Sequence, residues 1–185
     1  MEKNYPRIAR KEETEIIPTP ILNLLEIRTA ADRDKAAVWR IIKAVIAGGD
    51  TYVFDPETPE EEMTAYWFAW EKHVYVAEDA DGSIVGTFWL KPNQPGLGDH
   101  ICNAAYMVSP AAHGRGVGRQ MAEYSLDEAR RLGFTAMQFN FVVKSNVVAV
   151  KLWQSLGFEI IGEIPEAFRH KENGMTNAYI MYRKL

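Results

Sequence analysis

The sequence has almost no cysteine, since Cys102 is the single thiol among 185 residues. One cysteine excludes an internal disulfide, and the four histidines lack the spacing of metal ligands. We therefore expect no metal cofactor. A reducing compartment such as the cytoplasm suits this composition.

Long apolar runs are also lacking. No stretch approaches the roughly 20 residues that a membrane-spanning helix needs, and no signal peptide opens the chain. The formal net charge of −4 argues against a surface that coats nucleic acid. These absences predict a soluble, intracellular protein that binds neither a membrane nor a nucleic acid.

The chain holds enough apolar residues for one domain. With 185 residues, 47% of them hydrophobic, it can bury a full core but is too short for two ordinary domains. Residues 1–24 are polar and interrupted by Pro6, Pro18 and Pro20, which predicts an N-terminal extended arm. Residues 25–185 form the predicted domain.

Hydrophobic periodicity predicts alternating strands and helices after the arm. The expected strands are 25–28, 73–77, 84–91, 101–108, 136–143, 159–163 and 176–183. The expected helices are 29–48, a segment opened by a capping box at Thr58 and leading into 63–70, then 117–132 and 146–156. The segment 79–82 reads as a hairpin turn. This order predicts an α/β fold with helices on both faces of a mixed sheet.

The segment 108–119, VSPAAHGRGVGR, is the most informative part of the chain. It places an apolar strand, a turn, three alternating glycines and a helix start within a dozen residues. Glycines let backbone amides approach an anion closely, and a helix N-terminus favours phosphate, so we predict a pyrophosphate cradle. A Walker A loop would need Gly-Lys-Ser/Thr at its end, and a dinucleotide fingerprint would need a third glycine where Arg119 stands.

This block resembles the signature of the GCN5-related N-acetyltransferase family, in which Val-x-Pro precedes Gln/Arg-x-x-Gly-x-Gly/Ala. A second block, NVVAVKLWQSLGF at 146–158, resembles the family's Asn-x-x-Ala-x-x-Leu-Tyr-x-x-x-Gly-Phe helix. Two blocks in the right order are far more specific than either alone. The resemblance covers about residues 25–185 and implies a mixed, mostly antiparallel sheet that splays between its fourth and fifth strands.

The resemblance implies that acetyl-CoA is the co-substrate, with its pantetheine arm in the splay and its pyrophosphate on the glycine loop. The residues assigned to the coenzyme are Tyr106, Met107, Val108, His113, Gly114, Arg115, Gly116, Val117, Gly118, Arg119 and Asn146. The N–H of Val108 is the expected oxyanion donor, an effect of about 2.7–4 kcal/mol in other acyl-transfer enzymes. His113 departs from the family's Gln or Arg but can still donate to phosphate. Asn146 is also a favourable helix N-cap, and its two roles are compatible.

The general acid and base are not at their usual places. Trp153 stands where many members have a tyrosine that protonates the departing thiolate, and an indole N–H cannot release its proton at working pH. Core packing is therefore the expected role of Trp153. The positions of the family's glutamates carry Asn103 and Phe141. A water relayed by a polar side chain, or a carboxylate elsewhere, stays open as the base, with candidates Asn103, Asn140, His100, Asp50, Asp99 and Glu78.

Two asparagines lie in late, apolar strands, Asn140 in MQFNFVV and Asn177 in MTNAYIMY. We expect both to be buried, and a buried amide needs partners, which either the core or a substrate can supply. The pattern resembles a branch that includes fungal acetyltransferases of proline analogues such as azetidine-2-carboxylate, whose substrate site contains the two asparagines. With Tyr52 and Phe54 of the loop 48–59, they are the predicted acceptor-binding residues, and Asn140 is also a candidate catalytic residue.

The sequence therefore predicts an N-acetyltransferase in which the amine of a small molecule, such as an amino acid or proline analogue, attacks acetyl-CoA directly. No Gly-x-Ser-x-Gly elbow is present, and Cys102 has no evident His partner. Two alternatives stay open: acetylation of a protein N-terminus or lysine, and a non-catalytic acetyl-CoA-binding module. The choice between a monomer and a homodimer also stays open.

Overall fold

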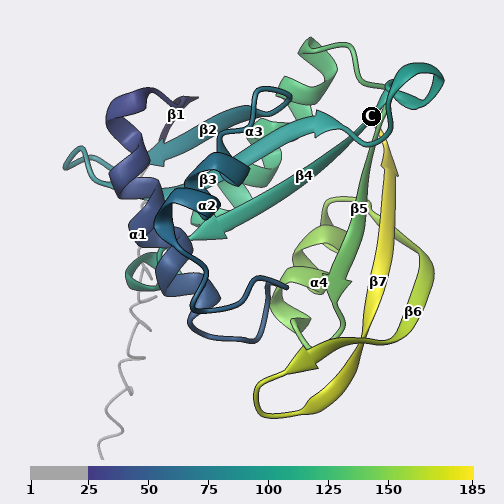
Figure 1. The fold of residues 1–185 in the computed structure, drawn as a ribbon. Helices are drawn as coiled ribbons and strands as arrows, with labels where there is room; N and C mark the ends of the chain where they lie inside the picture. The colour runs from purple at the N-terminus through teal and green to yellow at the C-terminus, as the bar shows by residue number, and fades with distance from the viewer. Residues whose placement is uncertain (1–24) are drawn as a thin grey trace, which may run out of the picture.

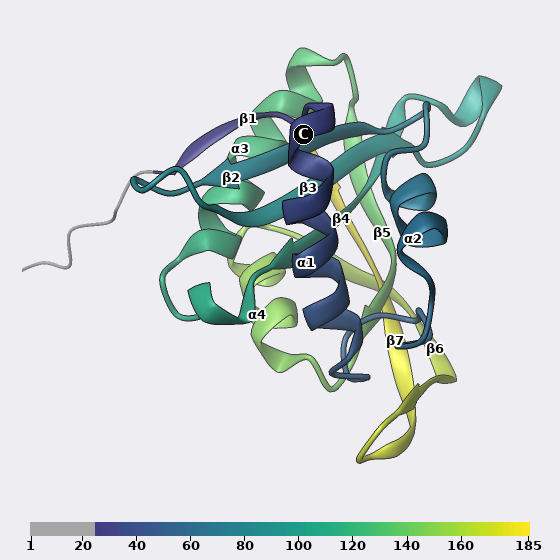
Figure 2. The ribbon, with the colours of Figure 1, turned by 60° about the vertical axis from the view of Figure 1, so that its left-hand side comes forward.

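Seven strands form one sheet, and four α-helices cover its two faces, in residues 25–185, which the computed structural model describes (Figures 1 and 2). The arm predicted for residues 1–24 lies outside the described residues. The strands are β1 (Glu26–Thr29), β2 (His73–Glu78), β3 (Ile84–Pro92), β4 (Ile101–Val108), β5 (Ala136–Val143), β6 (Glu159–His170) and β7 (Gly174–Lys184). The helices are α1 (Lys35–Ile46), α2 (Glu60–Trp67), α3 (Val117–Arg131) and α4 (Val147–Ser155), with 3-10 turns η1 (Asp32–Asp34), η2 (Gly96–Gly98) and η3 (Pro110–Ala112).

The sheet is mixed and mostly antiparallel. Its strand order is β1-β2-β3-β4-β5-β7-β6, and β4 with β5 is the one parallel pair between the strands described. This arrangement confirms the predicted fold class.

The parallel pair breaks almost at once. β4 and β5 are paired only at Ile101 with Ala136 and at Cys102 with Met137, and beyond these residues the two strands diverge, as Figure 1 shows. β4 remains paired with β3 as far as Val108, so its opposite edge is left open. The splay implied by the resemblance is therefore present.

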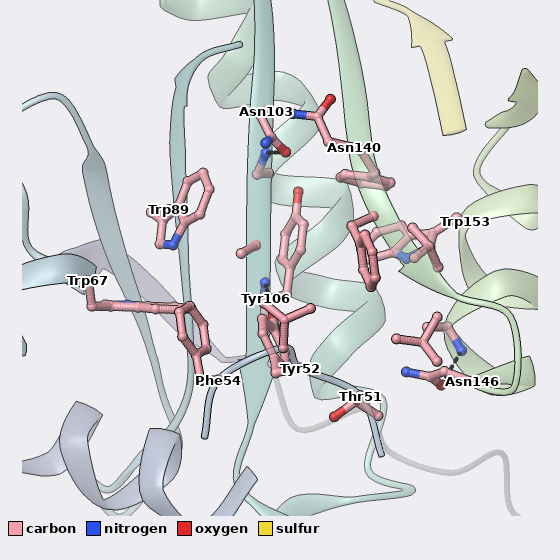
Figure 3. Close-up of a pocket in the computed structure, with 18 of the residues that line it drawn as sticks. Thr51, Tyr52, Phe54, Trp67, Trp89, Asn103, Tyr106, Asn140, Asn146 and Trp153 are labelled. Atoms are coloured by element: carbon pink, nitrogen blue, oxygen red, sulfur yellow. Dashed lines mark hydrogen bonds between the residues drawn. The ribbon is translucent and has the colours of Figure 1, made fainter. Parts of the chain in front are cut away.

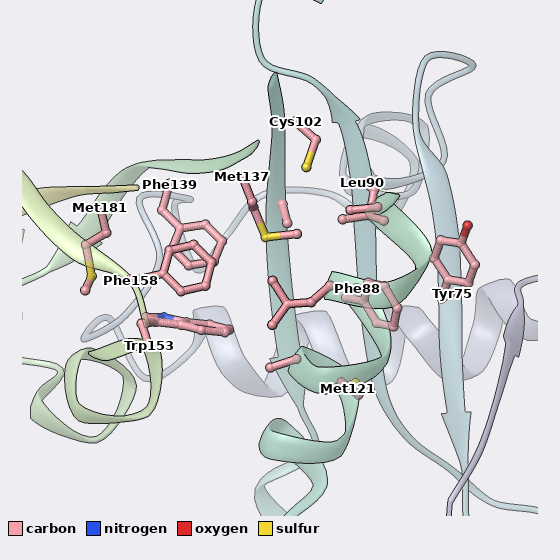
Figure 4. Close-up of a cluster of buried hydrophobic side chains, with 14 of the residues drawn as sticks. Tyr75, Phe88, Leu90, Cys102, Met121, Met137, Phe139, Trp153, Phe158 and Met181 are labelled. Carbon is pink, nitrogen blue, oxygen red and sulfur yellow. The ribbon is translucent and has the colours of Figure 1, made fainter. Parts of the chain in front are cut away.

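The core has two parts, one on each face of the sheet. Helices α1 and α2 pack on one face through residues such as Ile42, Met63 and Trp67. Helices α3 and α4 pack on the other through a larger cluster, shown in Figure 4, that includes Met121 and Trp153. The central strands are therefore covered on both faces, whereas most residues of β6 at the edge of the sheet are exposed.

Several predicted boundaries need correction. The helix expected over 29–48 is divided, with η1 preceding α1. The predicted capping box at Thr58 is wrong, because its hydroxyl donates to the carbonyl oxygen of Asp55 at 2.6 Å and Pro59 occupies the N-cap. β6 runs seven residues beyond the predicted strand end at 163. By contrast, β4 and β5 have the predicted bounds.

None of the helices in residues 25–185 is both long and apolar enough to cross a membrane.

Candidate active site

A cavity of about 220 Å³ lies where β4 and β5 diverge (Figure 3). Its walls come from the loop after α1, from α2 and α4, and from β3, β4 and β5. The lining residues are Thr51, Tyr52, Val53, Phe54, Tyr66, Trp67, Trp89, Asn103, Ala104, Ala105, Tyr106, Phe139, Asn140, Phe141, Val142, Val143, Asn146, Ala149 and Trp153. All of these described lining residues are apolar, aromatic or neutral polar, so the cavity carries no side-chain charge of its own.

The open edge of β4 supplies backbone hydrogen-bonding groups to this region. Ser109, at the end of the strand, donates its N–H to the carbonyl oxygen of Val85 in β3 at 2.9 Å. Because backbone groups alternate along a strand, those of Ala104, Tyr106 and Val108 point the other way, toward the gap that β5 leaves. An extended ligand laid along this edge could therefore bond to β4 as a neighbouring strand would.

Side chains cap two of these three positions. The hydroxyl of Tyr52 donates to the carbonyl oxygen of Tyr106 at 2.6 Å and accepts from the N–H of the same residue at 3.0 Å. The Oδ1 of Asn103 accepts from the N–H of Ala104 at 2.7 Å. Val108 lies beyond the cavity lining, next to the glycine loop. The predicted oxyanion donor is thus on the open edge but outside the cavity.

Tyr52 reaches β4 from the loop between α1 and α2. Burial raises the pKa of its phenol, so the hydroxyl stays protonated and can act as both donor and acceptor. Its ring stacks on that of Phe54, with centroids 6.1 Å apart. The structure therefore brings the two predicted acceptor-binding residues of this loop into the cavity.

The side chain of Tyr106 belongs to the core. Its hydroxyl shares a hydrogen bond of 2.7 Å with Ser125, its ring lies 4.9 Å from that of Trp153, and burial raises the pKa of its phenol. Tyr106 itself is half-buried, whereas Met107 and Val117 are buried. Met107 and Val117 could therefore meet a coenzyme only through their main chain.

The cavity wall formed by the loop after α1, by α2 and by β3 is aromatic. Phe54 meets Tyr66 edge to face at 5.0 Å, and Trp67 meets Trp89 in the same way at 6.1 Å. The indole nitrogen of Trp67 donates to Thr87 at 3.1 Å. That of Trp89 is buried and has no hydrogen-bond partner within the described part of the chain. Figure 3 shows it turned to the side of Trp67 and Phe54.

Asn140 lies at the rim of the cavity, where Figure 3 shows it beside Asn103. Its amide nitrogen donates to Asn93 Oδ1 at 2.7 Å, and its Oδ1 accepts from Gln138 at 2.8 Å. Contrary to the expectation of a strand buried on both faces, Asn140 is exposed. The reason is a register shift between β5 and β7 after Phe139, which takes residue 140 out of the ladder.

Asn177 is not brought to the cavity, in contrast to the prediction. It lies on β7, where its Oδ1 accepts from the N–H of Glu166 at 3.0 Å and its amide nitrogen donates to Glu163. Glu166 has a φ of +50° in an irregular stretch of β6. The amide of Asn177 thus bridges β7 to this strained turn, which explains a polar side chain in an apolar strand.

The glycine loop joins η3 to α3. Gly114 and Gly116 have φ of +75° and +77°, and a Cβ at either position would meet no atom within 4 Å. Gly116 is the N-cap of α3, so the free N–H groups of the first turn face this open space. Left-handed glycines that leave room beside a helix N-terminus have the geometry of an anion-binding loop, and the pyrophosphate cradle stays a prediction.

The charged residues of this loop are on the surface. His113 is exposed. Arg115 meets Asp79 at 3.4 Å, and Arg119 donates to the hydroxyl of Ser155 at 2.8 Å. Exposed contacts of this kind are weak, so both guanidinium groups are available to an anion. Gly118 lies in the first turn of α3.

The start of α4 is as the sequence predicts. The Oδ1 of Asn146 accepts from the N–H of Ala149 at 3.1 Å, which confirms the N-cap. Trp153, on the same helix, is buried with its ring 4.6 Å from that of Phe139. Its expected packing role is confirmed. Both residues also line the cavity.

Sequence reasoning misses part of the site. Tyr66 and Trp89 line the cavity, yet neither belongs to a motif, and only the density of aromatics around them is a signal. The alternative bases His100, Asp50, Asp99 and Glu78 lie outside the lining. Within residues 25–185, no group of three or more His, Cys, Asp or Glu side chains is placed to hold a metal ion.

Cys102 is buried and lies outside the cavity lining, with its Sγ 3.5 Å from the carbonyl oxygen of Ala136. Burial raises the pKa of the thiol to about 12. The side chain therefore stays a neutral thiol near neutral pH and is a poor nucleophile.

Comparison with known proteins identifies similar chains. The family model described as "Acetyltransferase (GNAT) family" matches residues 44–158. The N-acetyltransferase aca1 of Schizosaccharomyces pombe is 32% identical over 148 aligned residues, and the match covers 71% of this chain and 71% of that one. Protein SPT10 of Saccharomyces cerevisiae and bacterial mycothiol acetyltransferases are also similar, and the chain spans about half or less of their length.

Solved structures agree with the fold. A GCN5-related N-acetyltransferase from Kribbella flavida has a TM-score of 0.83 and 44% identity, covering 87% of this chain and 98% of that one. A phosphinothricin acetyltransferase from Sinorhizobium meliloti, solved in complex with acetyl-CoA, has a TM-score of 0.75 and 22% identity, covering 87% and 88%. The second likeness is one of fold alone.

The contrasting placement of the two asparagines leads to a prediction. Asn177→Ala should lower the free energy of unfolding by about 0.5–1.5 kcal/mol, because it removes the two hydrogen bonds that tie the irregular stretch of β6 to β7. Urea unfolding measures the loss. Asn140→Ala is the control and should cost under about 0.5 kcal/mol, since residue 140 is exposed and lies outside the ladder between β5 and β7. A larger loss for Asn140→Ala than for Asn177→Ala would contradict this assignment.

Proposed function

Since the chain belongs to the acetyltransferase (GNAT) family, we propose that it transfers the acetyl group of acetyl-CoA to the amine of a small molecule by direct attack. The observation that carries the proposal is the open edge of β4, which runs from the cavity to the glycine loop. Such an edge suits an extended thioester with a phosphate tail. A cytoplasmic place of work, where thiols stay reduced, is part of this proposal.

The residues present fit the coenzyme. The space beside Gly114 and Gly116 would accept the pyrophosphate on the amides at the start of α3. Arg115 and Arg119 are close enough in sequence and exposed enough to add charge-assisted contacts. The backbone groups of Val108 would bond to the pantetheine arm. Acetyl-CoA would supply the activated thioester.

We assign the oxyanion contact to the N–H of Tyr106 and keep Val108 for the pantetheine arm. Tyr106 lines the cavity in which an acceptor can meet the acetyl group, whereas Val108 does not. The N–H of Tyr106 already donates to an oxygen, that of the Tyr52 hydroxyl. A thioester carbonyl oxygen could accept the same N–H in its place.

Direct attack suits the groups around the cavity. The amine nitrogen forms a bond to the acetyl carbon, the carbon–sulfur bond breaks, and the thiolate leaves with the electron pair. A thiol has a pKa near 8.5, so it leaves without a strong acid beside it. The neutral Cys102 thiol argues against an acetyl-cysteine intermediate. The excess proton of the product passes to water.

The small cavity favours a small acceptor. Its volume of about 220 Å³ suits a compact amine such as an amino acid or a proline analogue. Asn140 at the rim stays a candidate acceptor contact, whereas the position of Asn177 removes the second contact that the proline-analogue branch implies.

A second hollow favours one alternative. A space of about 420 Å³ adjoins the cavity through Tyr52 and Phe54 and extends along Phe168, Arg169 and Met175 of the β6–β7 hairpin. A chain longer than one residue could lie there. Acetylation of a peptide N-terminus is therefore the second candidate function.

Thiol release across a panel of acceptors tests the proposal. Small amino acids, proline analogues and short peptides should give release above the rate of acetyl-CoA hydrolysis for at least one class. Preference for peptides by more than tenfold would favour the second candidate. Tight acetyl-CoA binding without turnover on any amine would contradict catalysis and favour a binding module.

The glycine loop should carry coenzyme affinity. Gly116→Val places a side chain where the pyrophosphate would lie and should weaken acetyl-CoA binding at least tenfold, or about 1.4 kcal/mol. Calorimetric titration measures the change. The matched control is Gly133→Val, which has a similar left-handed backbone and equally open space but is remote from the loop. Equal affinity in the two folded variants would exclude the loop as the phosphate site.

Removal of the Tyr52 hydroxyl should separate stability from coenzyme affinity. Tyr52→Phe leaves both backbone groups of Tyr106 uncapped, so the free protein should lose about 1–3 kcal/mol of stability. Acetyl-CoA should bind as tightly as before or tighter, because no hydroxyl has to be displaced. Thermal unfolding and titration measure the two effects, with Tyr66→Phe as the control for a wall hydroxyl. Binding weakened tenfold in a folded Tyr52→Phe variant would overturn the placement of the thioester.

A further inference from the structure

A buried lysine backs the aromatic wall of the cavity. Lys72 lies in the segment that joins α2 to β2, and the residue is only 8% exposed. Its ammonium nitrogen is 3.2 Å from the ring centroid of Tyr66 and 4.8 Å from that of Trp89. It also donates to the carbonyl oxygen of Tyr66. The two rings thus have an ammonium group against them, and both also line the cavity.

No carboxylate neutralises this ammonium in the described part of the chain. The neighbouring acid, Glu71, pairs with Lys91 at 3.9 Å, and Lys91 itself lies 6.0 Å from the ring centroid of Trp89. Burial, with a smaller effect of Lys91, lowers the pKa of Lys72 to about 8. The group is therefore mostly charged at neutral pH.

Aromatic walls ordinarily attract cations, because the face of each ring carries partial negative charge. Here the rings of Tyr66 and Trp89 already bind a cation, the ammonium of Lys72, so they attract a second cation less strongly. A cation in the cavity would lie near this positive charge, because Lys72 contacts two of the rings that line the cavity. It would find no carboxylate among the lining residues to offset the repulsion.

We propose that Lys72 makes the cavity select acceptors that enter as the neutral free base and exclude ammonium ions. The proposal rests on the proposed acetyltransferase function and ranks weakly basic amines with an apolar or aromatic body above amino acids and proline analogues, whose amines are mostly protonated near neutral pH. Such an amine has lost its proton to water before it binds. No base inside the cavity is then needed to deprotonate an ammonium ion, in keeping with a lining that, among the described residues, holds no carboxylate or histidine. The proton that the nitrogen releases when its bond to the acetyl carbon forms passes to water or to the departing thiolate. An acceptor carboxylate is compatible with the positive wall.

Two ligands of the same shape isolate the effect of charge. Benzyltrimethylammonium and neopentylbenzene differ only in a charged nitrogen in place of a carbon. Binding of each to the full chain can be followed by tryptophan fluorescence at pH 7. Lys72→Met should raise affinity for the cation at least tenfold and leave that for the neutral ligand within twofold.

Lys91→Met is the matched control. It removes a lysine near the same indole, but one that is paired with Glu71 and farther from the ring. Its effect on cation affinity should stay under threefold. Equal gains in the two variants would overturn the specific role of Lys72, because any nearby charge would then suffice.

The wild-type protein provides a test that needs no variant. As pH rises from 7 to 9 through the pKa of Lys72 near 8, the ammonium loses its proton and cation affinity should climb. Affinity for neopentylbenzene should stay flat. Tyr66 also faces Lys72, but burial raises the pKa of its phenol further above this pH range. Glu71 and Lys91 are present in both the wild type and Lys72→Met, so any effect of their titration appears in both proteins. Lys72→Met should abolish the pH dependence.

The outcomes distinguish failure of the Lys72 proposal from failure of the proposed acetyltransferase function. If cation affinity changes neither with pH nor in Lys72→Met, while the enzyme still acetylates some amine, the role of Lys72 is overturned and the proposed function stands. Absence of turnover on every amine overturns the proposed function, and the acceptor preference with it. If Lys72→Met does not fold, the wild-type pH series decides.

Discussion

A parallel strand pair that ends after two residues creates the site. Buried backbone groups need hydrogen-bond partners, and a strand that loses its neighbour leaves a row of them open. Along β4 the protein meets this need with side chains, Tyr52 for Tyr106 and Asn103 for Ala104. These caps keep the free protein intact and can give way to a ligand that offers the same atoms.

The elements around the splay divide the work between its two ends. At one end, left-handed glycines and the start of α3 supply N–H groups suited to an anion. At the other, aromatic rings from β3 and from the segment 51–67 enclose a cavity without charged lining residues. Lys72 behind these rings adds a positive charge that the lining does not offset. Anionic coenzyme and neutral amine thus suit opposite ends of one open edge.

Much of this arrangement could be predicted from local pattern. The apolar runs at 101–108 and 136–143 have the observed strand bounds, and Asn146 caps α4 as its chemistry predicts. These features depend on residues within a few positions of one another. The cap predicted at Thr58 is wrong, because its hydroxyl has a second local partner. It donates to the carbonyl oxygen of Asp55, three residues earlier, and does not cap the helix.

Sequence alone therefore determined the order of elements, the glycine turn and the family, because periodicity, left-handed glycines and motif spacing are local properties. The tertiary structure decided which residues meet. Tyr52 and Tyr106 are 54 positions apart, and a register shift in β5 exposed Asn140 at the rim. Asn177 lies on β7 against an irregular stretch of β6, outside the cavity lining. Such contacts depend on strand register and loop path, which no hydrophobic pattern encodes.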